Sequence, residues 1–222
     1  MGPTRTYADA CGIPRALDRV GERWALMIVR ELLLGPKRFT DLKDGLPHAS
    51  PNVLSQRLRE LEETGIVQRR TLPPPAGSKV YELTDWGLEL EPVLTALGRW
   101  GARSPLAPPE VGMSFDAHIL SLRTLFDPSL AEGFEATLEL RLGDQPFRAE
   151  VADGRLDIVR GQATAPDAVV TTDAGTMLAL AHGRLALEDA LQAGDIAIEG
   201  DREPVERFAG LFTLPRPYAP AP

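Results

Sequence analysis

A proline-rich stretch near the middle of the chain, GARSPLAPPEVGMS (101–114), limits the folds that are open to this sequence. It contains three prolines and two glycines and has no helical or strand periodicity, which is typical of an extended spacer. A chain of 222 residues has room for two domains. We therefore expect a first domain over residues 1–101, a linker over 102–113 and a second domain over 114–222.

The charge distribution supports this division. Residues 1–104 contain 15 Lys and Arg against 13 Asp and Glu, a net charge of +2, whereas residues 105–222 contain 9 against 19, a net charge of −10. Two halves of opposite charge indicate domains with different partners. The acidic second domain would repel DNA, so a nucleic-acid partner is expected only for the first domain.

The composition is that of a globular protein, with 43% hydrophobic and 25% charged residues. The single cysteine, Cys11, cannot form an internal disulfide, and the first ten residues lack the apolar core of a signal peptide. The longest apolar runs, such as WALMIV (24–29), are far shorter than the roughly 20 residues that span a bilayer. These features predict a cytoplasmic protein with no membrane partner.

The first domain contains a rapid succession of helix signals. Helices are expected over IPRALDRVG, WALMIVRELLLG, TDLKDGL and SPNVLSQRLRELEETG, with Thr40 capping the third and Ser50, followed by Pro51, capping the fourth. VQRRTL and VYEL then read as two strands around the loop PPPAGSK. A long last helix is expected from Thr84 to Trp100, and Pro92 should kink or locally unwind it. Helices followed by such a hairpin are the layout of a winged helix-turn-helix domain.

The fourth helix has two contrasting faces. Leu54, Leu58 and Leu61 share one narrow sector at 100° per residue, which predicts a core stripe. The opposite sector carries side chains of the kinds that hydrogen-bond to base edges: Asn52, Ser55, Gln56 and Arg59. The cap residue Ser50 is a further candidate for DNA contact at the start of the helix. An ordinary amphipathic surface helix would also have a polar outer face, so the pattern alone leaves that alternative open.

Three basic residues flank the tip of the expected hairpin. Arg69, Arg70 and Lys79 are placed to contact phosphate or the minor groove beside the fourth helix. The alternative is that they are solvated charges on a strand edge.

Residues 11–101 resemble the HxlR-type winged-helix transcription regulators. The motifs are the cysteine ahead of the first helix, G-x-R-W (21–24), RF-x-D-L (38–42), the SP…L-x-x-R-L-x-x-L helix and LT-x-x-G (83–87), all in order. The resemblance implies a DNA-binding homodimer whose two-fold is built from the first and last helices of the domain. Five apolar residues at helical spacing are the expected dimer seam, unless they belong to the core of one subunit: Leu90, Val93, Leu94, Leu97 and Trp100.

In some members of this family the matching cysteine senses electrophiles or oxidants. Cys11 is therefore a redox candidate by resemblance. Asp9 lies two residues before Cys11 and Arg15 four residues after it, and neither spacing shows that the thiolate is favoured. A structural role for Cys11 therefore stays open.

The second domain is expected to be α+β and rich in antiparallel strands. A helix over FDAHILSLRTLF precedes strands over ATLELRL, PFRAEVADG, RLDIVRG and DAVVTTD. Helices over AGTMLALAHG and LALEDALQAG, a strand over DIAIEGD and a helix over EPVERFAGLF follow. Gly143-Asp144 and Asp153-Gly154 are hairpin turn signals, the second of type I′.

This order of elements over residues 115–213 is similar to the sterol carrier protein type two fold. That resemblance implies an apolar cavity for a hydrophobic or amphipathic small molecule, although the same residues could form a solid core. The expected lining residues are Ile119, Leu122, Phe126, Leu138, Leu140, Phe147, Met177, Leu178, Leu187, Leu191, Phe208 and Phe212.

The sequence contains no catalytic constellation. Its three histidines lack metal-ligand spacing, and it has no G-x-S-x-G, P-loop or G-x-G-x-x-G motif. We therefore expect no enzymatic activity, metal or cofactor. The sequence predicts a homodimeric, sequence-specific transcriptional regulator whose DNA affinity responds to a hydrophobic small molecule in the second domain. The alternative is a carrier of hydrophobic metabolites in which the winged helix serves only for assembly.

Overall fold

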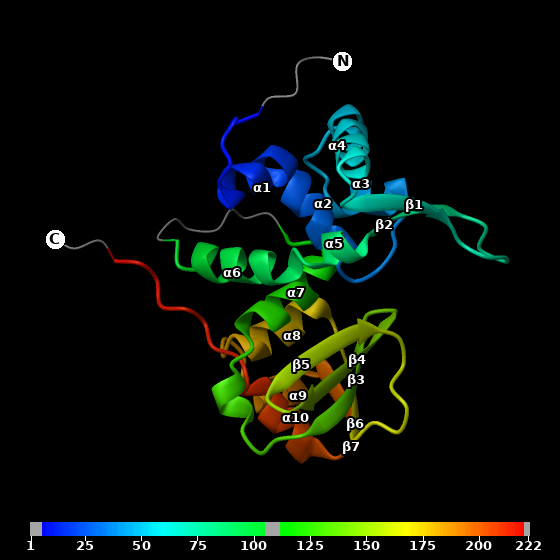
Figure 1. Cartoon of the computed structure of the whole chain (residues 1–222). Coiled ribbons are helices and arrows are strands. Elements are labelled where there is room, and N and C mark those ends of the chain that lie inside the picture. The colour runs from blue at the N-terminus through cyan, green and yellow to red at the C-terminus, as the bar shows by residue number, and fades with distance from the viewer. Residues whose placement is uncertain (1–5, 105–111, 220–222) are drawn as a thin grey trace. The chain divides into compact units, whose positions relative to one another are not determined.

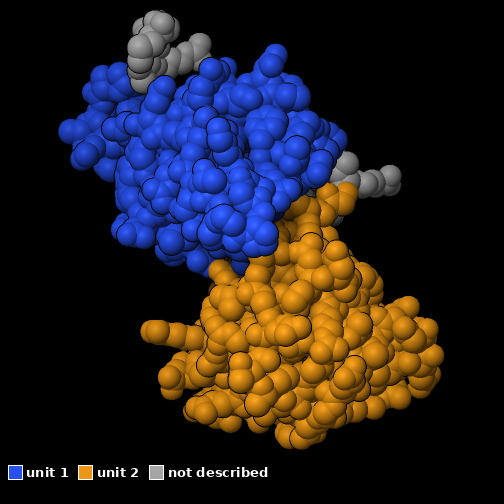
Figure 2. Space-filling model, turned by 90° about the vertical axis from the view of Figure 1, so that its right-hand side faces the viewer, with its two compact units in different colours: residues 1–94 blue, residues 95–222 orange. Residues whose placement is uncertain are grey.

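The computed structural model describes residues 6–104 and 112–219, and its chain forms two compact units, residues 1–94 and 95–222 (Figures 1 and 2). The division falls inside helix α6 (Glu91–Gly101), ahead of the expected linker at 102–113. Residues 105–111 of that linker lie outside the described residues. No helix in the described ranges is long and apolar enough to cross a membrane.

The N-terminal unit follows the predicted order of helices and hairpin. Its elements are α1 (Gly12–Val20), α2 (Ala25–Leu32), α3 (Phe39–Gly45), α4 (Pro51–Glu63), β1 (Val67–Thr71), β2 (Lys79–Leu83), α5 (Asp85–Leu88) and the start of α6. Strands β1 and β2 pair antiparallel, and their hairpin projects from the helices of this unit (Figure 1).

Local signals define the start of α4 as predicted, whereas the prediction that Thr40 caps α3 is wrong. The Ser50 Oγ accepts a hydrogen bond from the Val53 backbone N–H (N···O 3.3 Å), and Pro51 is the first helical residue, as predicted. Thr40 lies inside α3, and the N-cap is Arg38. The Asp41 carboxylate accepts from the Arg38 backbone N–H at 2.9 Å, so this amide needs no threonine cap.

The core of the N-terminal unit joins α4 to α2. Leu54, Leu58 and Leu61 are almost fully buried, and they belong to one cluster with Ile28 and Leu32 of α2. The predicted leucine stripe is thus the inner face of α4.

One carboxylate also lies inside this unit. The Glu31 side chain has no exposed surface, and it forms ion pairs with Arg30 (2.6 Å) and Lys37 (2.8 Å). The backbone of Lys37 exchanges two hydrogen bonds with Tyr81 of β2, at 2.9 and 2.8 Å. The Glu31–Lys37 pair therefore links α2 to the hairpin.

The single long helix expected after Thr84 is broken in two. Thr84 caps α5 as predicted, its Oγ1 accepting from the Gly87 N–H at 3.1 Å, but α5 ends at Leu88 and α6 begins at Glu91. Pro92 explains the break, because proline has no N–H to donate and its ring clashes with the carbonyl four residues earlier, at Leu88.

The C-terminal unit is α+β, as predicted. Beyond α6 its helices are α7 (Phe115–Leu125), the 3-10 turn η1 (Pro128–Ala131), α8 (Ala174–Ala181), α9 (Leu187–Ala193) and α10 (Arg202–Ala209). Its strands are β3 (Ala136–Leu142), β4 (Gln145–Ala152), β5 (Arg155–Arg160), β6 (Ala168–Thr172) and β7 (Ile196–Gly200). The sheet order is β5-β4-β3-β6-β7, antiparallel except for the β3–β6 pair. Asp153 and Gly154 both have positive φ angles, 51° and 68°, as the predicted type I′ turn requires.

One face of this sheet is apolar and covered. Leu140 pairs with Phe147 on one side and with Val170 on the other, and all three side chains are buried. Helices α7 and α10 contact the sheet. The opposite face carries ion pairs, including Arg141 with Glu139 at 2.8 Å, so the sheet has the one covered and one polar side that its alternating strands predict.

Candidate nucleic-acid interface and small-molecule sites

The polar face of α4 is accessible. Asn52, Gln56 and Arg59 are exposed and Ser55 is half-buried, while the leucines on the opposite side are buried. Asn52 and Arg59 are seven residues apart, about 10 Å along the helix, which matches about three base pairs of DNA. The structure therefore brings the predicted reading residues together on one open surface.

The members of this face differ in how they are held. The Gln56 amide donates to Glu60 at 3.0 Å. Arg59 has no ion pair within residues 6–104, so its guanidinium can turn to an outside acceptor. Arg57, which the sequence analysis did not single out, has a largely buried side chain that pairs with Glu60 and with Glu22 (3.5 Å). Of these two α4 arginines, Arg59 is the one directed outward.

The basic residues of the hairpin are partly neutralised. Arg69 forms an ion pair with Glu62 of α4 at 2.8 Å, and its guanidinium lies 5.1 Å from the centre of the Tyr81 ring. Arg70 pairs with Glu82 across the hairpin, also at 2.8 Å. Lys79 is exposed and has no ion pair in the described part of this unit. Both arginines keep about half of their side-chain surface, so either can still approach a phosphate.

The sequence analysis did not single out two exposed basic residues that precede α3 and α4. His48 is exposed two residues before the α4 cap, and Arg38 is exposed at the start of α3. Their position in the turn around α3 and α4 was the only signal, and the composition of the turn did not separate them from other loop residues.

The expected dimer seam divides between two directions. Leu90 and Leu94, four residues apart, pack against the N-terminal core. Val93, Leu97 and Trp100 point elsewhere and are exposed by 53%, 46% and 73%. Helix α1 also exposes two large apolar side chains that were not predicted individually, Ile13 and Leu17. Exposed apolar side chains on α1 and α6 are what an unpaired dimer surface would present.

Cys11 is the N-cap of α1 and is exposed as a free thiol. Its backbone N–H donates to the Asp9 carboxylate at 2.8 Å.

Most of the expected ligand-binding positions lie in the interior of the C-terminal unit. Nine of the twelve are buried, and the three that are half-buried are Leu187, Leu191 and Phe212. A pocket of about 820 Å³ in this unit is lined instead by loop residues that include Glu132, Phe134 and Asp153. None of the twelve expected positions lines that pocket.

Local contacts and burial shift the pKa of titratable groups in the C-terminal unit, including His182 and Asp173. Burial, with a smaller effect of Arg184, lowers the pKa of His182, which favours its neutral form. Hydrogen bonds from Thr176 lower the pKa of Asp173, the cap of α8. Among the described residues there is no group of three or more His, Cys, Asp or Glu that could hold a metal ion.

The fold and the open α4 face define a winged helix-turn-helix protein of the DNA-binding class. Residues 19–106 match the family described as HxlR-like helix-turn-helix. The chain is 41% identical over 86 residues to an uncharacterized HTH-type transcriptional regulator, YvaP of Bacillus subtilis. That match covers 39% of this chain and 80% of YvaP. The chain is 36% identical over 85 residues to the B. subtilis regulator YodB, covering 38% of this chain and 76% of that one. The chain belongs to the HxlR-like helix-turn-helix family of transcriptional regulators.

Two solved structures each resemble part of the chain. Quinone-bound YodB from B. subtilis is 32% identical, with a TM-score of 0.36. The match covers 40% of this chain and 93% of the YodB chain. A double mutant of the sec-alkyl sulfatase PisA1 is 23% identical, with a TM-score of 0.40. The match covers 55% of this chain and 17% of the PisA1 chain.

The C-terminal unit matches a family other than the one predicted. Residues 112–218 match the family described as alkyl sulfatase C-terminal. This match supports a distinct C-terminal domain that is similar to the C-terminal domain of alkyl sulfatases. The similarity to the sterol carrier protein fold stays a prediction.

Proposed function

We propose that this transcriptional regulator acts as a homodimer that reads DNA through α4. Ser50, Asn52, Ser55, Gln56 and Arg59 enter the major groove, while the hairpin with Arg69, Arg70 and Lys79 approaches the neighbouring backbone. The observation that carries this proposal is the exposed row of amide, hydroxyl and guanidinium groups on a helix whose other face is fixed in the core.

The dimer is built by α1 and α6. Ile13, Leu17, Val93, Leu97 and Trp100 supply apolar surface that is exposed in the single chain. A two-fold dimer places two copies of α4 on half-sites about 10 base pairs, or a multiple of that, apart. Leu97→Glu, with the exposed residue Glu63→Gln as a matched surface control, should yield monomers in sedimentation velocity, whereas unchanged dimers would exclude this seam.

Selection of bound sequences from a random DNA pool at near-physiological salt tests the reading role. The expected result is a pseudo-palindrome with two conserved half-sites. A pool that shows no enrichment would favour the alternative function, a carrier in which the winged helix serves only for assembly.

The C-terminal unit is a sensor for a hydrophobic or amphipathic small molecule. Support comes from its buried apolar sheet face and from the match to a family named after alkyl sulfatases. Binding changes DNA affinity only if the ligand favours one dimer geometry over another. A fluorescent fatty acid should therefore bind the full chain and shift its affinity for the selected DNA. If none of a broad set of lipophilic ligands changes the DNA affinity, the C-terminal unit does not act as a sensor.

Cys11 provides a second route for regulation. Its exposed thiol is open to oxidants, and a relative, YodB, has a structure described as quinone-bound. The family match begins at residue 19, however, so it does not include Cys11. Treatment with a quinone should weaken DNA binding of the native chain and leave Cys11→Ser unaffected, and equal responses of the two proteins would assign Cys11 a structural role only.

A further inference from the structure

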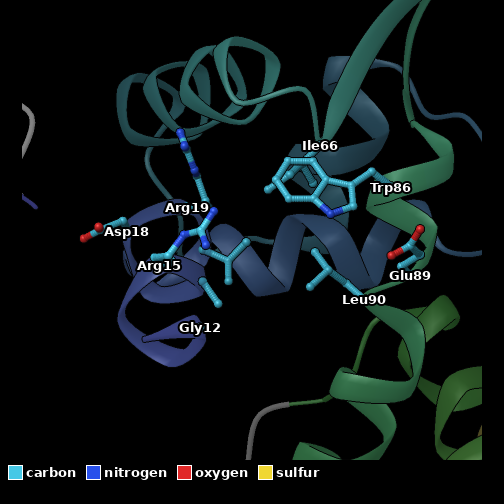
Figure 3. Close-up of a pocket in the computed structure, with 10 residues that line it drawn as sticks. Gly12, Arg15, Asp18, Arg19, Ile66, Trp86, Glu89 and Leu90 are labelled. Carbon is cyan, nitrogen blue, oxygen red and sulfur yellow. The ribbon is translucent and has the colours of Figure 1, made fainter. Parts of the chain in front are cut away.

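A pocket of about 390 Å³ lies in the N-terminal unit, and none of the predicted reading residues of α4 lines it (Figure 3). It is lined by α1 residues that include Arg15 and Arg19, by Ile66, by Trp86 of α5, and by Glu89 and Leu90, which lie between α5 and α6. Its volume is within the range of pockets that hold small molecules, about 300–1,000 Å³. All of its residues belong to one unit, so the pocket is a property of the DNA-binding unit itself.

The two sides of the pocket differ in chemistry. Figure 3 shows Arg15 and Arg19 on the α1 side, and the Trp86 ring with Leu90 on the other. Ile66 is buried behind them, whereas half of the Trp86 surface is exposed. An exposed indole beside an aliphatic floor is a stacking surface for a flat apolar group.

The charges favour an anion on the α1 side. Arg15 and Arg19 are exposed and, within the described residues, neither guanidinium has an ion pair. The Asp18 carboxylate is already engaged, because it accepts from the Thr6 hydroxyl at 2.9 Å and from a backbone amide at 3.0 Å. The Glu89 carboxylate lies beyond Trp86 from the arginines (Figure 3). Two arginines one helical turn apart can therefore share one carboxylate.

We propose that this pocket binds a small aromatic carboxylate. Its ring stacks on Trp86 above Ile66 and Leu90, and its carboxylate accepts hydrogen bonds from Arg15 and Arg19. This site is separate from the C-terminal sensor described above and does not depend on it.

The proposed dimer contact borders this pocket. At 100° per residue, the centre of the pocket-lining positions of α1, between Arg15 and Ala16, lies about 110° around the helix from Ile13 and about 150° from Leu17, whereas the lining residue Val20 lies only about 20° from Ile13. A second copy of the chain is therefore the competing occupant that the experiment must exclude.

Titration of the full chain with 2-naphthoate tests the proposal, with tryptophan fluorescence and calorimetry as readouts. We expect saturable binding that changes Trp86 emission, and the neutral analogue 2-naphthylmethanol should bind at least about tenfold more weakly because it cannot use the arginines. Equal binding of the acid and the alcohol, or no binding of the acid, would overturn the proposal.

Variants locate the site. Arg15→Gln with Arg19→Gln should weaken naphthoate binding about tenfold or more, whereas Arg155→Gln, an exposed arginine in the other unit, should not. Trp86→Phe should remove the emission change and keep a folded circular dichroism spectrum. If Arg155→Gln weakens binding equally, or the emission change survives Trp86→Phe, the ligand binds elsewhere. If these substitutions instead convert dimers to monomers in sedimentation velocity, the pocket is a contact between copies.

Discussion

Replacing Arg59 by alanine should relax the base preference of this regulator at one position in each half-site. Arg59 is exposed on α4, seven residues after Asn52, and it has no ion pair within the described N-terminal residues. Within those described residues, no ion pair therefore has to break when this guanidinium reaches a base. A bidentate contact between an arginine and guanine contributes about 1–3 kcal/mol of discrimination. At about 1.4 kcal/mol per tenfold, that is a loss of preference of about 5-fold to 150-fold.

Arg69 is the matched comparison, because it is an arginine of the same unit with a different environment. It is held by Glu62 at 2.8 Å in the free protein and lies on the hairpin. Arg69→Ala should weaken binding on all sequences alike and reduce the salt slope by up to about one, as expected for a phosphate contact.

The assay is a competition titration of each variant against a panel of operators that differ by single base pairs, at fixed salt. Arg59→Ala should flatten the panel at one position and leave the others unchanged. If the relative affinities of Arg59→Ala across the operators equal those of the native protein, α4 does not read the bases. A loss confined to one sequence for Arg69→Ala would contradict its assignment to the backbone.

Three further predictions concern stability. Leu58→Ala, at a position with no exposed surface, should lower the free energy of unfolding by about 2–5 kcal/mol in chemical denaturation, and a change below 1 kcal/mol would show that α4 is loosely packed. Glu31→Gln should cost about 3–5 kcal/mol because it removes the buried negative charge that pairs with both Arg30 and Lys37, and a neutral result in the same assay would mean that the pair does not tie α2 to the hairpin. Asp173 has a lowered pKa, so its contribution is present above the unfolded pKa of about 3.9 and is lost as the pH falls through the folded value. The stability difference between the native protein and Asp173→Asn should therefore shrink below about pH 4, and a constant difference would refute the assigned cause.

The N-terminal elements were predictable because their signals are local. Ser50 followed by Pro51 begins α4, and the leucine spacing identifies its buried face. The predicted cap of α3, Thr40, is two residues away from the observed cap, Arg38. The helix begins after Arg38 because the Asp41 carboxylate accepts a hydrogen bond from the Arg38 backbone N–H.

Pairing between distant residues was not predictable from the same signals. Arg69 meets Glu62 and Arg70 meets Glu82 only because the hairpin register and the α4–β1 contact bring them together. Likewise, helical spacing placed Leu90 and Val93 on one helix, but only the packed core determines that Leu90 turns inward and Val93 outward.

The pocket beside α1 shows the same limit. Arg15 and Trp86 are 71 positions apart in the sequence, and Trp86 occupies only an unspecified position of the LT-x-x-G motif. Their shared pocket depends on how α5 follows the hairpin back to α1, which no local pattern encodes.

A site-specific photocrosslink tests the central claim most directly, namely that the outer face of α4 contacts DNA bases. The chain has one cysteine, so a Cys11→Ser background allows a benzophenone to be attached at Ser55→Cys on this face or, as a control, at the exposed C-terminal end of the helix through Glu63→Cys. The account predicts crosslinks from position 55 to bases within the selected half-site and none from position 63. Absence of a crosslink from position 55, or equal crosslinking from both positions, would contradict it.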